Sequence, residues 1–298
     1  GKMSKSRIEK ELLPAATTIY TPDWAIRYMA QNSLGKLWKM GHINDEFGKW
    51  KYYLPDAPQS AFIREQLKRI VDDFQDIAPE NIRLIDPCMG SGHILVYCFD
   101  MLMDIYESQG YSSRDAASMI LENNLYGFDI DNRAAQLSYF AVMMKARECD
   151  RRILTRNVNT HVFAIVESNN INRMHLNYFG ATMSAQDKQE ANRSIVEILD
   201  VFKDSKEYGS ILKVSDYNWE LLEKFIDDVN VDSQISFDTI GIEETKECLY
   251  QLLVQARAFA QKYHVVITNP PYLGNSRFSP KLDKYVKNYY PDEKTDLS

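Results

Sequence analysis

Residues 81–93 have the sequence Asn-Ile-Arg-Leu-Ile-Asp-Pro-Cys-Met-Gly-Ser-Gly-His. The first six of these residues predict a short apolar strand, and the apolar stretch from His93 to about Glu107 is long enough for a helix. The loop between them contains Gly90 and Gly92, which lack side chains and let a ligand approach the backbone closely. We therefore expect a ligand-binding turn between a buried strand and a helix.

Strands and helices alternate on both sides of this turn. Further strands are predicted at residues 125–129, 161–166 and 264–268, and further helices at 21–39, 59–74, 131–148 and 242–262. We expect Thr21 to cap the first helix and Pro22 to occupy its first position. The alternation predicts an α/β fold with a Rossmann-like, doubly wound and mainly parallel sheet.

The segment at residues 170–238 interrupts this alternation. It mixes asparagines, charges and short apolar runs, so we expect a largely helical insertion that includes a helix at 187–203. We divide the chain into an N-terminal helical segment, residues 1–80, and an α/β domain, residues 81–298, that carries the insertion.

Composition bounds the class of protein. The chain has 298 residues, a net charge of −7, four isolated cysteines and no apolar run near the ~20 residues that span a bilayer. Its first residues lack the apolar core of a secretion signal, so we expect a cytoplasmic protein. Because the cysteines are isolated from one another, we expect reduced thiols and no metal site. The net negative charge disfavours tight DNA binding by this chain alone.

The glycine loop departs from the two common phosphate-binding loops. A nicotinamide fingerprint requires a third small residue where Leu95 stands, and a Walker loop requires a Gly-Lys-Ser/Thr sequence that is absent. We therefore expect a nucleoside ligand without a pyrophosphate, and S-adenosylmethionine fits this description. Asp86 would favour its positive charge. The other candidate residues of the loop are Pro87, Cys88, Gly90 and Gly92. A purely structural turn is the alternative.

Asp129 ends the second predicted strand, at the sheet edge where α/β proteins bind ligands. Its carboxylate can accept hydrogen bonds from both hydroxyls of a ribose, and Ile130 can then press against the adenine of the same ligand. Helix capping is the alternative role for an acid in this place. We assign capping to Asp131 and ribose binding to Asp129.

The sequence Asn269-Pro270-Pro271-Tyr272 directly follows the last predicted strand. Two prolines make a stiff turn, which suits a site that must hold an amide and a carbonyl in place. The side-chain oxygen of Asn269 and the carbonyl of Pro270 can accept hydrogen bonds from the two N–H groups of an exocyclic amino group. These hydrogen bonds free the nitrogen lone pair for attack on a sulfonium methyl group. Such a base must leave the duplex, and Tyr272 can stack on it.

These motifs, in this order, resemble those of the class I methyltransferases of the gamma group, which modify adenine N6 in DNA. The resemblance rests on Thr21-Pro22, residues 86–92, Asp129 and the Asn269 turn. A longer tract, residues 267–296, is similar to the methyltransferase of bacterial BREX phage-defence systems and to type IIG restriction-modification enzymes. The resemblance implies S-adenosylmethionine as cofactor, double-stranded DNA with a flipped adenine as substrate, defence-system subunits as partners and no membrane.

The resemblance also implies roles for single residues. Thr21 would help to hold the carboxylate end of the cofactor, and Gly90 and Gly92 would line its methionine and ribose. Glu167 or Asn169 would meet the cofactor adenine near the third strand. We expect the chain to end before the target recognition domain of the family.

Two other functions share part of the pattern. Glutamine-N5 methyltransferases of release factors also carry Asn-Pro-Pro-Tyr, because a side-chain amide poses the same lone-pair problem. Three lysines interleaved with tyrosines after Tyr272 favour a nucleic acid instead. These lysines are Lys281, Lys284 and Lys287. A non-catalytic cofactor-binding scaffold is the second alternative, which the intact Asn269 and Tyr272 disfavour because a pure binder does not need them.

Overall fold

The computed structural model describes residues 21–42, 48–229, 241–271 and 278–292 of the chain. These residues fall into two compact units. One unit comprises the chain up to Ala164 together with the residues from Tyr263 onward, and the other is Ile165–Lys262. Each unit has its own hydrophobic core.

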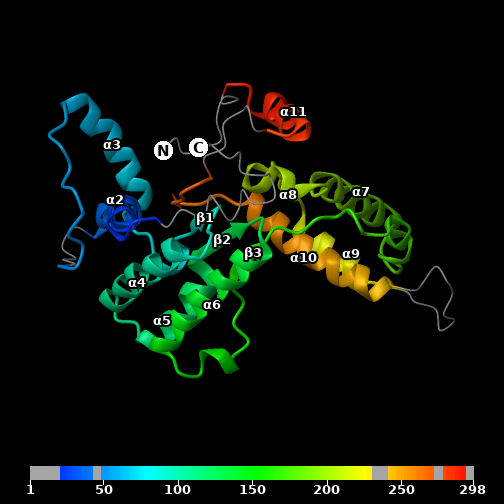
Figure 1. The fold of residues 1–298 in the computed structure, drawn as a ribbon, viewed down its shortest axis with the longest axis horizontal. Coiled ribbons are helices and arrows are strands. Elements are labelled where there is room, and N and C mark those ends of the chain that lie inside the picture. Colours follow the sequence, from blue (N-terminus) through cyan, green and yellow to red (C-terminus); the bar gives the residue numbers. More distant parts are fainter. Residues whose placement is uncertain (1–20, 43–47, 230–240, 272–277, 293–298) are drawn as a thin grey trace, which may run out of the picture. The chain divides into compact units, whose positions relative to one another are not determined.

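The first unit is built on a parallel sheet (Figure 1). The strands that the structure describes lie in the order β3-β2-β1-β4, and they are β1 (Leu84–Asp86), β2 (Leu125–Asp129), β3 (His161–Ala164) and β4 (Val265–Val266). Leu84 pairs with Leu125 on one side and with Val265 on the other. The chain therefore runs outward from β1 to β3 and then places β4 on the other side of β1. This reversal is the topological switch point of a doubly wound sheet, and it confirms the predicted fold class.

Three strands are shorter than predicted, whereas β2 has the predicted bounds. β1 begins three residues late because Pro79–Asn81 forms a 3-10 turn, η2. β3 ends at Ala164, where the second unit begins. β4 covers only two residues, but the backbone stays beside β1, since the Ile267 N–H donates to the Ile85 carbonyl at 3.0 Å. The chain thus remains in sheet-like contact up to the Asn269 turn.

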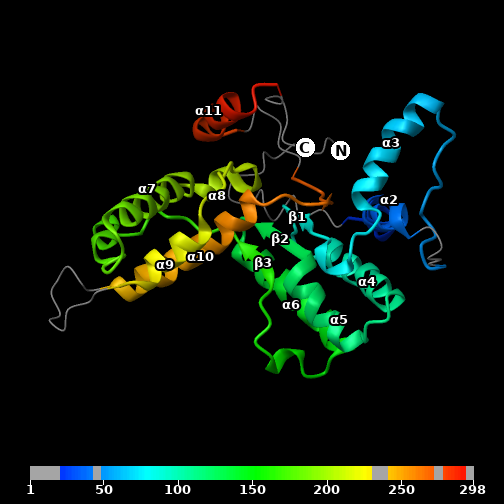
Figure 2. The ribbon, with the colours of Figure 1, turned by 180° about the vertical axis from the view of Figure 1, so that it is seen from behind.

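Helices pack on the sheet and on one another (Figure 1, and from behind in Figure 2). α4 (His93–Ser108) and α6 (Asn132–Cys149) connect the strands and contact both β2 and each other, and α2 (Asp23–Gly41) packs against α4. α5 (Ser113–Met119), absent from the sequence-based prediction, leads through the π turn η3 (Ile120–Asn124) into β2. The other helical elements of this unit are α3 (Ala61–Phe74), η4 (Ile153–Thr155) and α11 (Pro280–Tyr289).

The start of α2 corrects one expectation. Pro22, not Thr21, is the N-cap residue, with φ −56° and ψ 139°, and no side chain caps this helix end. The Pro22 carbonyl accepts the Ala25 and Ile26 N–H groups, so the helix begins one residue later than a threonine cap requires. The predicted capping by Thr21 is therefore wrong, and the Thr21 hydroxyl is engaged elsewhere. Asp23 lies in the first turn, where its carboxylate interacts favourably with the positive end of the helix dipole.

The second unit is largely helical, as predicted. It contains η5 (Arg173–Tyr178), α7 (Ala185–Val201), α8 (Ser205–Tyr208), η6 (Gly209–Ile211), α9 (Trp219–Asp227) and α10 (Ile242–Ala260). Phe179, Phe202 and Phe225 are fully buried in its core. The unit takes in α10 as well as the described part of the 170–238 segment. In the part of the chain that the structure describes, no helix is both long and apolar enough to cross a membrane.

Candidate functional site

The glycine loop after β1 is tied to the end of β2. The Met89 N–H donates to the Phe128 carbonyl at 3.0 Å, and the Gly90 N–H donates to Oδ2 of Asp129 at 2.9 Å. Within the loop, the Gly92 N–H donates to the Met89 carbonyl at 2.8 Å. These bonds hold the loop at the carboxyl edge of two neighbouring strands, where a doubly wound sheet binds its ligands.

The two glycines of the loop have different surroundings. Gly90 has φ +51° and Gly92 has φ +81°, a backbone region that residues with a side chain rarely adopt. A Cβ on Gly90 would meet no described atom within 4 Å, whereas a Cβ on Gly92 would lie 2.4 Å from Oγ of Ser138. Gly90 therefore leaves open space over the loop, and Gly92 is needed for close packing against α6. The open space at Gly90 is what a bound nucleoside requires.

Asp86 is an acid enclosed at the end of β1, with no exposed surface. Its Oδ1 accepts the Cys88 N–H at 3.1 Å. The Thr268 hydroxyl lies close enough to lower the pKa of the carboxyl, but no well-formed hydrogen bond joins it, or any other described group, to Oδ2. Burial raises the pKa of Asp86 to about 7, with the charge of Asp129 adding to the rise and the Thr268 hydroxyl and Cys88 N–H opposing it. A buried carboxylate with an unpartnered oxygen favours a nearby positive charge, which fits the predicted ligand.

Asp129 connects the loop to the next helix. Its Oδ2 accepts the Gly90 N–H, and its Oδ1 accepts the Asp131 N–H at 2.9 Å. Burial raises the pKa of Asp129, against the effect of both N–H donors. A carboxylate has about four lone-pair sites, so these two bonds leave capacity for ribose hydroxyls. The two backbone bonds give Asp129 a structural role, and ribose binding stays a prediction.

The two residues that follow Asp129, Ile130 and Asp131, differ in their surroundings. Asp131 is the N-cap of α6, and its side chain accepts the Arg133 N–H at 2.8 Å, which confirms the predicted capping. Ile130 has 40% of its surface exposed beside the loop. An apolar side chain in that position is available to contact a ligand.

The Asn269 turn follows β4 and therefore lies at the same sheet edge as the loop of β1. Asn269 and Pro270 are half-buried and Pro271 is exposed. The Nδ2 group of Asn269 donates to Oγ1 of Thr21 at 3.0 Å, which joins positions 248 residues apart. Tyr272 lies outside the described residues.

Two site residues were missed by the sequence reasoning. Thr268 precedes the Asn269 turn, and its buried hydroxyl influences Asp86 on the neighbouring strand. Ser138 lies against Gly92 from the middle of α6, and its buried Oγ has no partner in the described part of the chain. The parallel pairing of β1 with β4 is the signal that could have identified Thr268. No local signal marked Ser138.

The two candidates for the cofactor adenine belong to the second unit. Asn169 donates to Oδ1 of Asp204 at 2.9 Å and accepts the Asp204 N–H at 2.9 Å. Oε1 of Glu167 accepts the Lys206 N–H at 3.4 Å. Asn169 therefore uses both ends of its amide to hold Asp204, a residue with positive φ.

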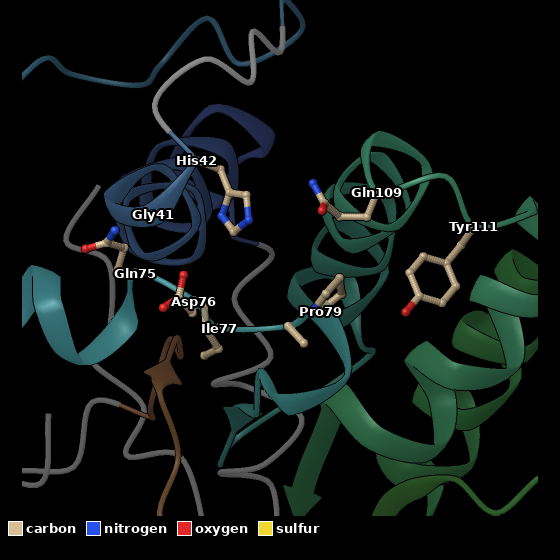
Figure 3. Close-up of a pocket in the computed structure, with 9 residues that line it drawn as sticks. Gly41, His42, Gln75, Asp76, Ile77, Pro79, Gln109 and Tyr111 are labelled. Carbon is tan, nitrogen blue, oxygen red and sulfur yellow. The ribbon is translucent and has the colours of Figure 1, made fainter.

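A cavity of about 460 Å³ lies elsewhere in the first unit (Figure 3). His42 at the end of α2, Asp76 after α3 and Gln109 at the end of α4 contribute to its lining. Pro79, which precedes β1, also lines it, so the cavity lies at the amino end of that strand. The glycine loop and the Asn269 turn are at the carboxyl end. None of the predicted site residues that the structure describes lines this cavity.

Comparison with known proteins gives a consistent result. The family model described as Eco57I restriction-modification methylase matches residues 123–298. The chain is 35% identical to the adenine-specific methyltransferase BrxX of Escherichia coli O9:H4 (strain HS), over 100% of this chain and 25% of that protein. It is 34% identical to the adenine-specific methyltransferase PglX of Lacticaseibacillus casei (strain Zhang), over 96% of this chain and 24% of that protein. The chain thus spans about a quarter of the length of these relatives.

Proposed function

The chain belongs to the Eco57I restriction-modification methylase family, and we propose that it carries the cofactor-binding and catalytic part of an S-adenosylmethionine-dependent DNA adenine-N6 methyltransferase. One observation carries the proposal. The glycine loop of β1 and the Asn269 turn of β4 lie at one sheet edge, and Asn269 is bonded there to Thr21. The cofactor and catalytic motifs thus come together at the switch point of the sheet.

The residues at the sheet edge suit the proposed cofactor. S-adenosylmethionine supplies a methyl group activated by a sulfonium centre. Asp86 places negative charge near the sulfonium group. The open space over Gly90 lets the cofactor approach the backbone of the loop closely. Asp129 accepts the ribose hydroxyls with its remaining lone pairs, and Ile130 contacts the adenine. Pro87, Cys88 and Gly92 shape the loop, and Thr21 holds the carboxylate end.

The residues of the Asn269 turn act on the substrate. The side-chain oxygen of Asn269 and the carbonyl of Pro270 accept the two N–H bonds of adenine N6, which concentrates the lone pair on nitrogen as positive charge develops there. Pro271 stiffens the turn, and Tyr272 stacks on the base. The base reaches this turn only after it has left the duplex, since its N6 group is otherwise paired.

DNA is the proposed partner because of both the relatives and the tract after the turn. Both relatives are adenine-specific methyltransferases by name, which favours adenine over a glutamine side chain as the substrate. On α11, Lys281, Lys284 and Lys287 are exposed and suit phosphate contacts. We place the protein in the cytoplasm with a restriction-modification or BREX-type defence system, with residues 1–80 as a helical segment and 81–298 as the catalytic domain.

Calorimetric titration of the chain tests the cofactor assignment. We expect saturable binding of S-adenosylmethionine and S-adenosylhomocysteine, no binding of NAD, and weaker binding after Asp129→Ala. Transfer of a labelled methyl group to DNA then separates an enzyme from a cofactor-binding scaffold. A folded chain that binds none of these ligands, or that prefers NAD, would contradict the proposal.

A further inference from the structure

We propose that Thr21 is a positioning residue for Asn269, because its hydroxyl accepts the Asn269 amide and thereby fixes which end of that amide faces the substrate. The inference rests on the proposed function and deepens it. The carrying observation is the hydrogen bond of 3.0 Å from Nδ2 of Asn269 to Oγ1 of Thr21. It assigns the start of α2 a part in the chemistry at the end of β4.

The backbone on both sides of this bond is restricted by proline. Thr21 precedes Pro22, and Asn269 precedes Pro270. A residue before proline is largely confined to extended backbone, so neither residue can turn away easily. Pro22 also begins α2, which packs against α4 in the same unit. The remaining freedom at Asn269 lies in its side-chain torsions, and the bond to Thr21 limits these.

The orientation of the amide decides whether Asn269 can act. Adenine N6 presents two N–H donors, so it needs the oxygen of Asn269 and not its NH2 group. An amide rotated by half a turn would set donor against donor. The Thr21 hydroxyl can accept from the NH2 end of the amide or donate to its oxygen, so it selects one orientation only while its own proton is donated to another group. A cofactor carboxylate that accepts this proton leaves the hydroxyl as an acceptor, which favours the rotamer of the structure, with Nδ2 facing α2 and Oδ1 facing away from it. The hydroxyl keeps one proton to donate, which is compatible with a cofactor carboxylate.

The contact is tested on the chain itself by NMR of selectively ¹⁵N-asparagine-labelled protein. The side-chain NH2 pair of Asn269 is assigned by its disappearance in Asn269→Asp. We expect Thr21→Val, which removes the hydroxyl at nearly constant shape, to shift this pair and to speed its exchange with water. Thr21→Ser, which retains the hydroxyl, is the matched control and should resemble the wild type. A pair unchanged by Thr21→Val would overturn the inference.

The consequence for catalysis is measured as single-turnover methyl transfer to single-stranded DNA at saturating S-adenosylmethionine. Misplacement of a positioned group costs about tenfold or more, so we expect at least that loss in Thr21→Val and near-complete rescue in Thr21→Ser. Equal rates in the wild type and Thr21→Val would also overturn the positioning role. A wild-type chain that binds the cofactor and transfers no methyl group would instead contradict the proposed function, and the NMR result would still decide whether Thr21 orients Asn269.

Discussion

Binding of S-adenosylmethionine should tighten as the pH rises through 7, because Asp86 must be ionised to favour the positive charge of the cofactor. Burial raises the pKa of this carboxyl to about 7. With that pKa, roughly a tenth of Asp86 is ionised at pH 6 and roughly nine tenths at pH 8. If binding requires the ionised form, the dissociation constant should fall by about tenfold between these values, or about 1.4 kcal/mol.

The same carboxyl should make the stability of the ligand-free chain depend on pH in the opposite direction: stability should fall as the pH rises, whereas cofactor affinity should increase. Its pKa in the folded chain lies above the ordinary value of 3.8, so the folded state retains a proton that the unfolded state has released. The stabilisation present at low pH is therefore lost as the pH rises to 7 and above, at most by roughly 4 kcal/mol for a shift of about three units. Asp86→Asn should remove this dependence and stabilise the ligand-free chain at pH 8.

Calorimetry at pH 6, 7 and 8 on the wild type and on Asp86→Asn measures the effect on binding. The amino group of the cofactor titrates equally with both proteins, so the difference between them isolates Asp86. The variant retains an oxygen to accept the Cys88 N–H and serves as a matched control. Affinity that does not change with pH in the wild type, or that changes equally in Asp86→Asn, would refute the role of this carboxylate.

Three further outcomes are expected. Gly92→Ala should destabilise the chain by at least about 2 kcal/mol, because the new methyl group overlaps Ser138 and the backbone has positive φ. Gly90→Ala has only the strain of positive φ, so it should destabilise the chain by about 1–2 kcal/mol and chiefly weaken cofactor binding. Thermal melts measure the loss of stability, and calorimetry measures the loss of binding. Asp129→Asn should lower cofactor affinity by about tenfold in calorimetry, because charge-assisted hydrogen bonds are worth roughly 1.5–3 kcal/mol. Lys284→Gln should reduce the salt dependence of single-stranded DNA binding by about 0.7 in log–log slope, and an unchanged slope would remove this lysine from the DNA contact.

The sequence was sufficient for the parallel sheet and for the sheet edge at which the candidate residues lie. Apolar runs ending at Asp86, at Asp129 and before Asn269 predict strands, and parallel strands present their carboxyl ends together. That logic required no knowledge of side-chain contacts. It also separated Asp131 from Asp129, because a helix start needs a cap immediately before it.

The sequence was not sufficient where distant side chains decide the outcome. The bond between Thr21 and Asn269 joins residues 248 positions apart, and local propensity instead suggested a helix cap for Thr21. The tight fit of Gly92 depends on Ser138, which no motif marked. The enclosure of Asp86, which raises its pKa, accompanies the position of β1 between β2 and β4 and has no signature in the loop sequence.

The central claim is most directly tested by the product of a reaction with S-adenosylmethionine that carries a trideuterated methyl group. The chain is incubated in excess with adenine-containing single-stranded DNA, which needs no extrusion of the base, and the digested nucleosides are analysed by mass spectrometry. Because the net charge of −7 disfavours DNA binding by this chain, we expect slow formation of N6-trideuteromethyladenine that disappears in Asn269→Ala. Label on another base, or no labelled adenine from a chain that binds the cofactor, would contradict the account.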